Sequence, residues 1–138
     1  MTRQLLDYED RLLDHLDGLG LPYPVVTDTN TAGASISLVS SPGSKTVRTY
    51  YDGAMDKEYS HFIQLKASLL DGNGPRQTAY NTLLAIGADL ESLIDLPSQN
   101  GSYDFGRIVV SNEPYFLDAS EEGYLLFRLS INTALTIY

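Results

Sequence analysis

The stretch YSHFIQLKAS, residues 59–68, alternates between two kinds of side chain and decides the fold class of this chain. One set is mostly apolar and the other mainly polar: Tyr59, His61, Ile63, Leu65 and Ala67 alternate with Ser60, Phe62, Gln64, Lys66 and Ser68. A period of two residues predicts a β-strand, because successive side chains of a strand point to opposite faces. One apolar and one polar face are typical of a strand in an antiparallel sheet that is open to water on one side.

Further strands are predicted on both sides of this one, because β-branched and aromatic residues cluster between turn signals. They cover residues 25–29, 35–39, 46–51, 105–110 and 124–137. The polar residues 52–58, which begin with Asp52-Gly53, are expected to form a loop. The last two strands follow one another directly, which predicts an antiparallel pair.

Two segments repeat apolar side chains at the three- and four-residue spacing of a helix. They are residues 3–18 and residues 75–96, and the second starts at Pro75 and is closed by Pro97. The order is therefore helix, several strands, one long helix and two strands. We expect a single α+β domain over residues 1–138, with a mainly antiparallel sheet covered by the helix 75–96 and with an additional N-terminal helix.

The charge of the chain is strongly acidic, which limits its partners. Nine Lys and Arg residues oppose eighteen Asp and Glu residues in 138 residues, so the formal net charge is −9. The acids concentrate in the two predicted helices and in residues 105–138, whereas residues 21–70 are neutral. Nonspecific nucleic-acid binding is not expected, because phosphates attract Lys and Arg. No apolar run approaches the ~18 residues of a membrane span, so no membrane partner is expected.

The sequence contains no recognisable catalytic motif. It has no cysteine, no G-x-S-x-G pattern and no metal-ligand spacing, so no cofactor and no metal are expected. His61 falls on the apolar face of its strand, where a hydrogen-bonded core or semi-core histidine is more common than a catalytic base. His15 is expected at the surface.

Ten tyrosines and no tryptophan are a more informative feature of the composition. Tyr50, Tyr51, Tyr103, Tyr115 and Tyr138 lie in or near predicted loops and strand ends. Tyrosine is common in strands, but it is also enriched where proteins contact one another. Because Tyr50 and Tyr51 are adjacent, one of them must face away from the core if both lie in a strand.

An ordered series of short patterns runs over nearly the whole chain. A leucine-rich N-terminal helix is followed by Gly-Leu-Pro at 20–22, Tyr-Asp-Gly at 51–53, YSHFIQ at 59–64, RQTA at 76–79, NGSYDF at 100–105, Pro114 and DASEEG at 118–123. Together these patterns resemble the small minor capsid or tail terminator proteins of long-tailed bacteriophages.

This resemblance implies a structural protein of the virion rather than an enzyme, assembled in the host cytoplasm and working without a cofactor. Tail terminators form a ring, commonly a hexamer, on the last ring of the major tail tube protein. The ring stops tube growth and presents a surface to the head-completion protein. Each subunit of a closed ring must offer two different surfaces to its neighbours. The DNA passes through the ring without specific binding.

Two groups of residues are candidates for these functions. Contacts with a neighbouring subunit or with the tail tube are expected at Tyr50, Tyr51, Asn100, Ser102, Tyr103 and Tyr138. Because carboxylates repel DNA phosphates, the lining of the channel is expected to include some of Asp52, Asp56, Glu58, Asp118, Glu121 and Glu122. The polar segments 53–58 and 98–104 are expected to be loops that become ordered on assembly.

Three other functions are compatible with the sequence. The first is another minor capsid or neck component of the same virion. The second is a small acidic hydrolase that uses carboxylates and His61. The third is a soluble binding module that shares the architecture, since a fold does not determine a function.

Overall fold

The computed structural model describes residues 6–26, 33–41, 45–68, 75–119 and 123–138, and these residues form an α+β fold. The elements are α1 (Tyr8–Asp17), β1 (Ser35–Ser40), β2 (Lys45–Thr49), β3 (Met55–Ser68), α2 (Pro75–Ser92), β4 (Tyr103–Ala119) and β5 (Tyr124–Ile137). The five strands form one antiparallel sheet. The predicted fold class and the mainly antiparallel sheet are therefore confirmed.

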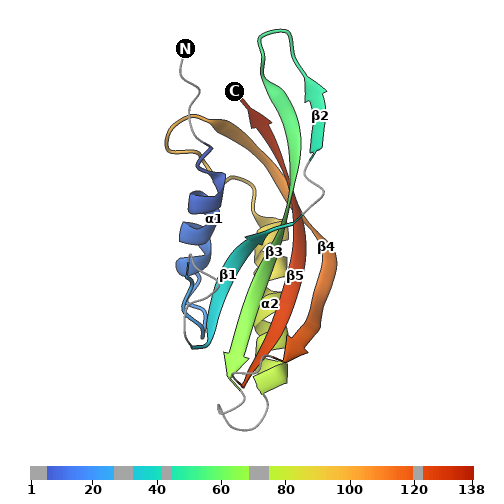
Figure 1. The fold of residues 1–138 in the computed structure, drawn as a ribbon. Helices are drawn as coiled ribbons and strands as arrows, with labels where there is room; N and C mark the ends of the chain where they lie inside the picture. Colours follow the sequence, from blue (N-terminus) through green and yellow to red (C-terminus); the bar gives the residue numbers. More distant parts are fainter. Residues whose placement is uncertain (1–5, 27–32, 42–44, 69–74, 120–122) are drawn as a thin grey trace.

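The strand order of the sheet is β1-β3-β5-β4, and β2 pairs with the first part of β3. The pairing of β3 with β5 extends from Met55 opposite Ile137 to Ser68 opposite Tyr124. β1 and β2 occupy successive parts of the same edge of β3. The hairpin of β2 and β3 consequently projects at one end of an elongated molecule, beside the C-terminus (Figure 1).

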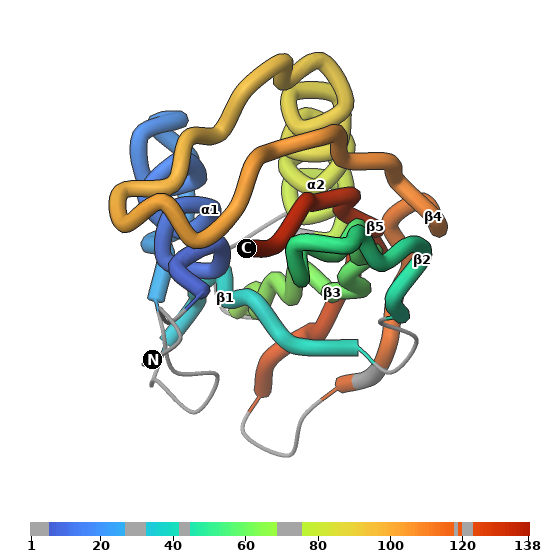
Figure 2. Tube along the Cα trace, turned by 90° about the horizontal axis from the view of Figure 1, so that it is seen from above, coloured from blue at the N-terminus to red at the C-terminus, as the bar shows by residue number. Residues whose placement is uncertain are grey.

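Both helices pack on the same face of the sheet (Figures 1 and 2). In α1, the ring of Tyr8 lies 5.7 Å from the ring of His61 on β3. In α2, a Cβ at Gly87 would lie 3.2 Å from Val110 of β4, so glycine allows the helix to approach the sheet closely. The core between the two layers is apolar and includes Leu12, Leu16, Leu83, Ile86, Leu90, Ile63, Leu65, Leu129 and Ile131, all at most 1% exposed.

Both helices differ from the predicted ranges. α2 ends at Ser92, so the predicted end at residue 96 was wrong. The Leu93 N–H donates to the Leu90 carbonyl at 3.2 Å, and Ile94 is 93% exposed. The apolar spacing in the sequence therefore extends past the end of the helix. α1 begins at Tyr8, five residues after the predicted start, and residues 3–5 lie outside the described part of the chain.

Three predicted strands were too short or displaced. Residues 55–58, predicted as loop, belong to β3, because β2 and β5 pair with them on both sides. Residues 103–104, predicted as loop, and residues 111–119 belong to β4, which continues through several register shifts along β5. Of the predicted strand 25–29, Val25 forms an isolated bridge with Ile36, and residues 27–29 lie outside the described residues.

Candidate functional site

The most exposed regular element is the β2–β3 hairpin, and a tight turn holds its tip. The Tyr50 N–H donates to the Ala54 carbonyl at 2.8 Å, and the Gly53 N–H donates to the Tyr50 carbonyl at 3.1 Å. Gly53 has φ +89°, a conformation that glycine adopts at little cost. The Asp52 carboxylate accepts the Ala54 N–H at 3.0 Å, so the Asp-Gly pair forms the turn that its residue types predict.

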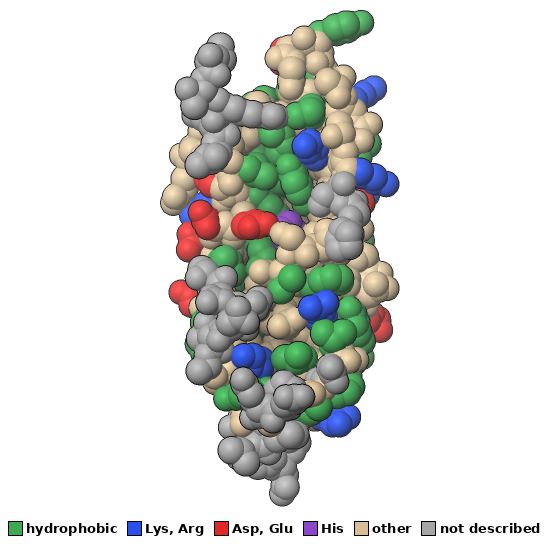
Figure 3. Space-filling view, in the orientation of Figure 1, with side chains coloured by type: hydrophobic (Ala, Val, Ile, Leu, Met, Phe, Trp, Pro, Cys, Tyr) green, Lys and Arg blue, Asp and Glu red, His purple; other side chains and the backbone are tan. Residues whose placement is uncertain are grey.

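The hairpin exposes apolar side chains. All five residues of β2 are exposed, with Val47 63% exposed, and the side chain of Tyr51 at the tip is completely exposed. The space-filling view shows a hydrophobic side chain extending from this end of the molecule (Figure 3). Large exposed apolar patches mark surfaces that bind other proteins, and aromatic side chains are enriched in such surfaces.

Asp56 ties the hairpin to the last strand. Its carboxylate accepts one hydrogen bond from the Thr136 hydroxyl and one from the Tyr50 hydroxyl, each at 2.7 Å. These two bonds, with a smaller contribution from the Arg48 guanidinium, hold the pKa of Asp56 below its ordinary value. The guanidinium of Arg48 also lies 5.6 Å from the centre of the Tyr50 ring. The projecting hairpin is thus held in one orientation by charged hydrogen bonds.

The C-terminal residue joins the same region. The Tyr138 hydroxyl donates to the Asp104 carboxylate, and this bond, together with the charges of Asp104, Asp52 and Asp56, raises the pKa of the Tyr138 phenol. The Tyr138 N–H donates to the Ser102 carbonyl at 3.2 Å, which attaches Tyr138 to the residue that precedes β4. We call Val47, Tyr50, Tyr51, Asp56 and Tyr138 the hairpin surface.

The predicted contact residues are divided between surface and interior. Tyr50, Tyr51 and Tyr138 are exposed and lie at this end of the molecule, and Asn100 is exposed in the loop before β4. Ser102 and Tyr103 are each only 3% exposed, so within one subunit they lie in the interior rather than on the surface. The Tyr103 hydroxyl donates to the Leu96 carbonyl at 2.7 Å, and burial raises its pKa to about 12.

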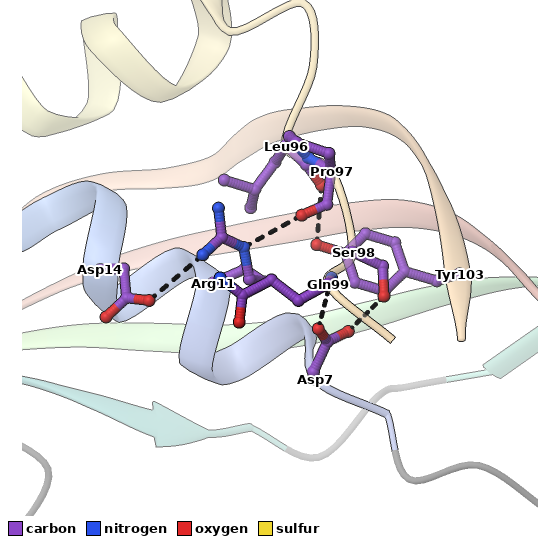
Figure 4. A network of polar contacts seen from close by, with 8 residues as sticks. All are labelled: Asp7, Arg11, Asp14, Leu96, Pro97, Ser98, Gln99 and Tyr103. Atoms are coloured by element: carbon purple, nitrogen blue, oxygen red, sulfur yellow. Dashed lines mark hydrogen bonds and ion pairs between the residues drawn. The ribbon is translucent and has the colours of Figure 1, made fainter. Parts of the chain in front are cut away.

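The loop before β4 is a support for α1 (Figure 4). The carboxylate of Asp7, at the N-terminal end of α1, accepts the Ser98 hydroxyl at 2.6 Å, the Gln99 N–H at 2.8 Å and the Ser102 hydroxyl at 3.0 Å. Arg11 adds a bond from Nε to the Pro97 carbonyl at 3.0 Å. Partial burial would raise the pKa of Asp7, but the hydrogen bonds outweigh it and the pKa is lowered. Residues 98–102 are therefore bound within the subunit.

The predicted channel acids whose backbone the structure describes lie in two separate parts of the sheet. Asp52, Asp56 and Glu58 lie at the hairpin end, where Asp56 is opposite Thr136. Asp118 is opposite Leu126, ten residues further along β5, which corresponds to a distance of about 33 Å at ~3.3 Å per residue. The side chain of Asp118 and the residues Glu121 and Glu122 lie outside the described part of the structure.

The two histidines join α1 to the rest of the fold. His61 is 4% exposed, as predicted for a core or semi-core position, and its Nε2 lies 2.9 Å from Oε1 of Glu9. Its Nδ1 is buried and has no hydrogen-bond partner. His15, predicted at the surface, is partly exposed and lies 2.6 Å from the carboxylate of Asp89 on α2.

Sequence reasoning missed three participants of this region, which are Val47, Asp104 and Thr136. Thr136 pairs with Asp56 of β3 on one side and with Asp104 of β4 on the other, and Asp104 accepts the Tyr138 hydroxyl. Pairing between distant strands leaves no local signal in the sequence. Val47 could have been noticed, since it is the apolar residue within the charged and polar segment KTVRT. Beside it lies a hollow of about 340 Å³, lined by Val47, Asp56, Lys57, Glu58, Gly106, Ala134, Leu135 and Thr136.

No family model matches the chain, and no curated protein matches it. Within the described residues, no group of three or more His, Asp or Glu side chains is placed to hold a metal ion. No helix in the described ranges combines the length and the hydropathy that crossing a membrane requires.

Proposed function

We propose that this protein is a structural subunit of a phage virion at the head–tail junction, where a ring of copies, six in the simplest case, caps the tail tube and ends tail assembly. The observation that carries the proposal is the hairpin surface, whose apolar side chains are exposed on an ordered hairpin at one end of the molecule. A subunit that stops a growing tube must offer such a protruding, rigid element to the last tube ring. The resemblance of the sequence to tail terminators supports the same function.

In this proposal the hairpin surface contacts the major tail tube protein. Tyr51 and Val47 provide the apolar contact area. The hydrogen bonds of Asp56 already order the hairpin before it binds, so binding costs little conformational entropy. The opposite end of the elongated domain then faces the head-completion protein. We further propose that the acids around Asp52, Asp56 and Asp104 contribute to a channel wall that repels DNA, so that DNA passes without specific binding.

The layered fold suits such a subunit. In the ring we expect α2 and the residues up to Leu96 to act as the layer that covers the sheet and stiffens it, in addition to α1. The assembled protein would be found in the virion, after assembly in the host cytoplasm. Chemistry at a catalytic centre has no part in this function, and it needs no cofactor.

The experiment is a tube-elongation assay with purified major tail tube protein from the same phage. Tyr51→Ala removes a fully exposed side chain and should leave the free energy of unfolding unchanged. A central aromatic contact residue is worth about 2 kcal/mol or more, so we expect at least about 30-fold weaker capping. Leu117→Ala, which removes a 40% exposed apolar side chain near the other end of β4, is the matched control and should cap normally.

The same assay distinguishes a tail terminator from the related alternative, a neck component. A neck component would bind the head-completion protein and leave tube length unchanged, whereas a terminator shortens the tubes in proportion to its concentration. If the wild-type protein leaves tube length unchanged, or if Tyr51→Ala caps as well as the wild type, the proposed function is wrong.

A further inference from the structure

The loop that supports α1 contains the dipeptide Asn100-Gly101, and both residues are exposed. An asparagine side chain reacts with its own backbone most readily when glycine follows it, because glycine has no side chain that hinders the approach of its amide nitrogen. Gly101 has φ +73°, a left-handed conformation that glycine adopts at little cost. The dipeptide is thus a reactive sequence placed in a tight turn.

The Asn100 side chain bends back over the peptide bonds that follow it. Its Oδ1 accepts the Ser102 N–H, two residues further along the chain, at 3.0 Å. An asparagine that bonds to the backbone two residues on forms a local side-chain turn. The Gly101 nitrogen lies within the ring of atoms that this bond closes, so the turn holds the side-chain carbon Cγ close to that nitrogen.

Hydrogen-bond donors are already directed at the oxygen on which charge would develop. Besides the Ser102 N–H, the Ser98 hydroxyl lies 3.0 Å from Oδ1 of Asn100. When a nitrogen attacks Cγ, the negative charge forms on Oδ1, and donors that are in place before the reaction stabilise it. The Ser98 hydroxyl shares its one proton between Oδ1 and the Asp7 carboxylate at 2.6 Å, so the Ser102 N–H is the constant donor.

We propose that Asn100 is a site of spontaneous deamidation in the folded protein. The Gly101 nitrogen forms a bond to Cγ, the bond from Cγ to Nδ2 breaks, and Nδ2 leaves as ammonia with the proton of the Gly101 amide. Water then opens the resulting succinimide ring. Attack of water on Cγ gives aspartate, whereas attack on the main-chain carbonyl gives isoaspartate, whose backbone is longer by one carbon. Each product carries one additional negative charge.

The new carboxylate forms beside that of Asp7. The Asp7 carboxylate accepts the Gln99 N–H at 2.8 Å and the Ser98 hydroxyl at 2.6 Å, and it also bonds to the Asn100 backbone (Figure 4). After deamidation two carboxylates compete for the single proton of Ser98 and repel one another. Since Asp7 holds the start of α1, deamidation is a slow and irreversible change that weakens the attachment of this helix.

Peptide mass spectrometry of the purified protein, incubated at mildly alkaline pH, tests the reaction. We expect conversion of the amide to an acid at residue 100, with both aspartate and isoaspartate among the products. Asn112 is also exposed but precedes a glutamate, so it should remain asparagine over the same time. Asn100→Gln should abolish the conversion at this position, because a glutamine side chain must close a larger ring. No conversion at Asn100, or equal conversion at Asn112, would overturn the proposal.

A comparison of folded and unfolded protein separates the effect of the turn from that of the dipeptide. In a denaturing concentration of guanidinium chloride the hydrogen bonds of the loop are lost, while Asn100-Gly101 remains. Because the turn holds Cγ near the Gly101 nitrogen and the Ser102 N–H stabilises Oδ1, we expect the folded protein to convert at least as fast. Slower conversion in the folded protein would show that the fold protects Asn100 and would overturn the proposal.

The effect on α1 is tested with Asn100→Asp, which reproduces one of the two products. We expect a lower urea midpoint than that of the wild type at pH 7, and a much smaller loss in the Asp7→Asn background, where the repelling carboxylate is absent. Asn112→Asp adds the same charge at an exposed position of β4 and should leave the midpoint unchanged. Equal losses from Asn100→Asp in both backgrounds would overturn the coupling with Asp7. These measurements use the protein alone, so their outcome is independent of tube capping.

Discussion

Replacing Asp7 by Asn should detach the start of α1 from the loop before β4. The Asp7 carboxylate accepts hydrogen bonds from Ser98, Gln99 and Ser102 at 2.6–3.0 Å. An amide keeps one acceptor oxygen and turns the other into a donor, which then faces the donors of the loop. The substitution also removes a negative charge next to the N-terminus of a helix.

The magnitude follows from these contacts. A hydrogen bond to a charged group contributes about 1.5–3 kcal/mol, but Asp7 is partly exposed and water weakens this value. With about 0.5 kcal/mol for the helix dipole, we expect Asp7→Asn to lower the free energy of unfolding by about 2 kcal/mol at pH 7. For a chain of this length the midpoint of thermal unfolding should fall by about 8 °C.

The effect should depend on pH in a defined direction. The pKa of Asp7 is lower in the folded protein than in the unfolded chain. Its stabilisation is therefore complete above the unfolded pKa of about 4, and it is lost as the pH falls through the folded pKa. The difference between wild type and Asp7→Asn should thus be largest at pH 7 and should shrink near pH 2.5.

Urea unfolding followed by far-UV circular dichroism at both pH values measures this difference. The control is Asp14→Asn, which removes an exposed ion pair of 3.3 Å with Arg11 and should change stability by less than about 0.5 kcal/mol. If Asp7→Asn is as stable as the wild type at pH 7, or if its deficit is the same at both pH values, the reasoning about this network is wrong.

Two further substitutions test the packing of the sheet. Tyr8→Phe removes the hydroxyl that bonds to Thr133, a residue with no exposed area, and should cost about 1–3 kcal/mol in urea unfolding, whereas Tyr80→Phe at an exposed site should be neutral. Gly106→Ala would place a Cβ 2.6 Å from the Ala134 carbonyl oxygen, so the two strands must separate. We expect a loss of about 1–3 kcal/mol and faster hydrogen exchange of β4 amides, and an unchanged exchange pattern would contradict this account.

The sheet was predictable where its alternation is regular. The final strand was predicted over residues 124–137, and β5 has these bounds, because its alternating side chains face the core at every second position. The helix over 75–96 was predicted too long, since Leu93 and Ile94 continue the apolar spacing while the chain leaves the helix after Ser92. The periodicity shows only which side chains are apolar. The end of the helix depends on tertiary contacts, in which the carbonyls of Leu96 and Pro97 accept hydrogen bonds from Tyr103 and Arg11.

The candidate site was predictable only in part for a similar reason. The exposed tyrosines of the hairpin were identified from residue type and turn signals, and Tyr50 and Tyr51 lie at the tip. Ser102 and Tyr103 belong to the same kind of polar segment, yet they are buried because Asp7 and Leu96 supply partners from elsewhere in the chain. Polarity alone does not distinguish a loop that binds another protein from a loop whose polar groups are hydrogen-bonded within the same chain.

The most direct test of the proposed function is electron cryomicroscopy of tail tubes that were grown in the presence of this protein. We predict one additional ring at a single end of each tube, with sixfold symmetry and with the hairpin of β2 and β3 against the last tube ring. Tubes with bare ends, or density attached along the sides of the tube, would contradict it.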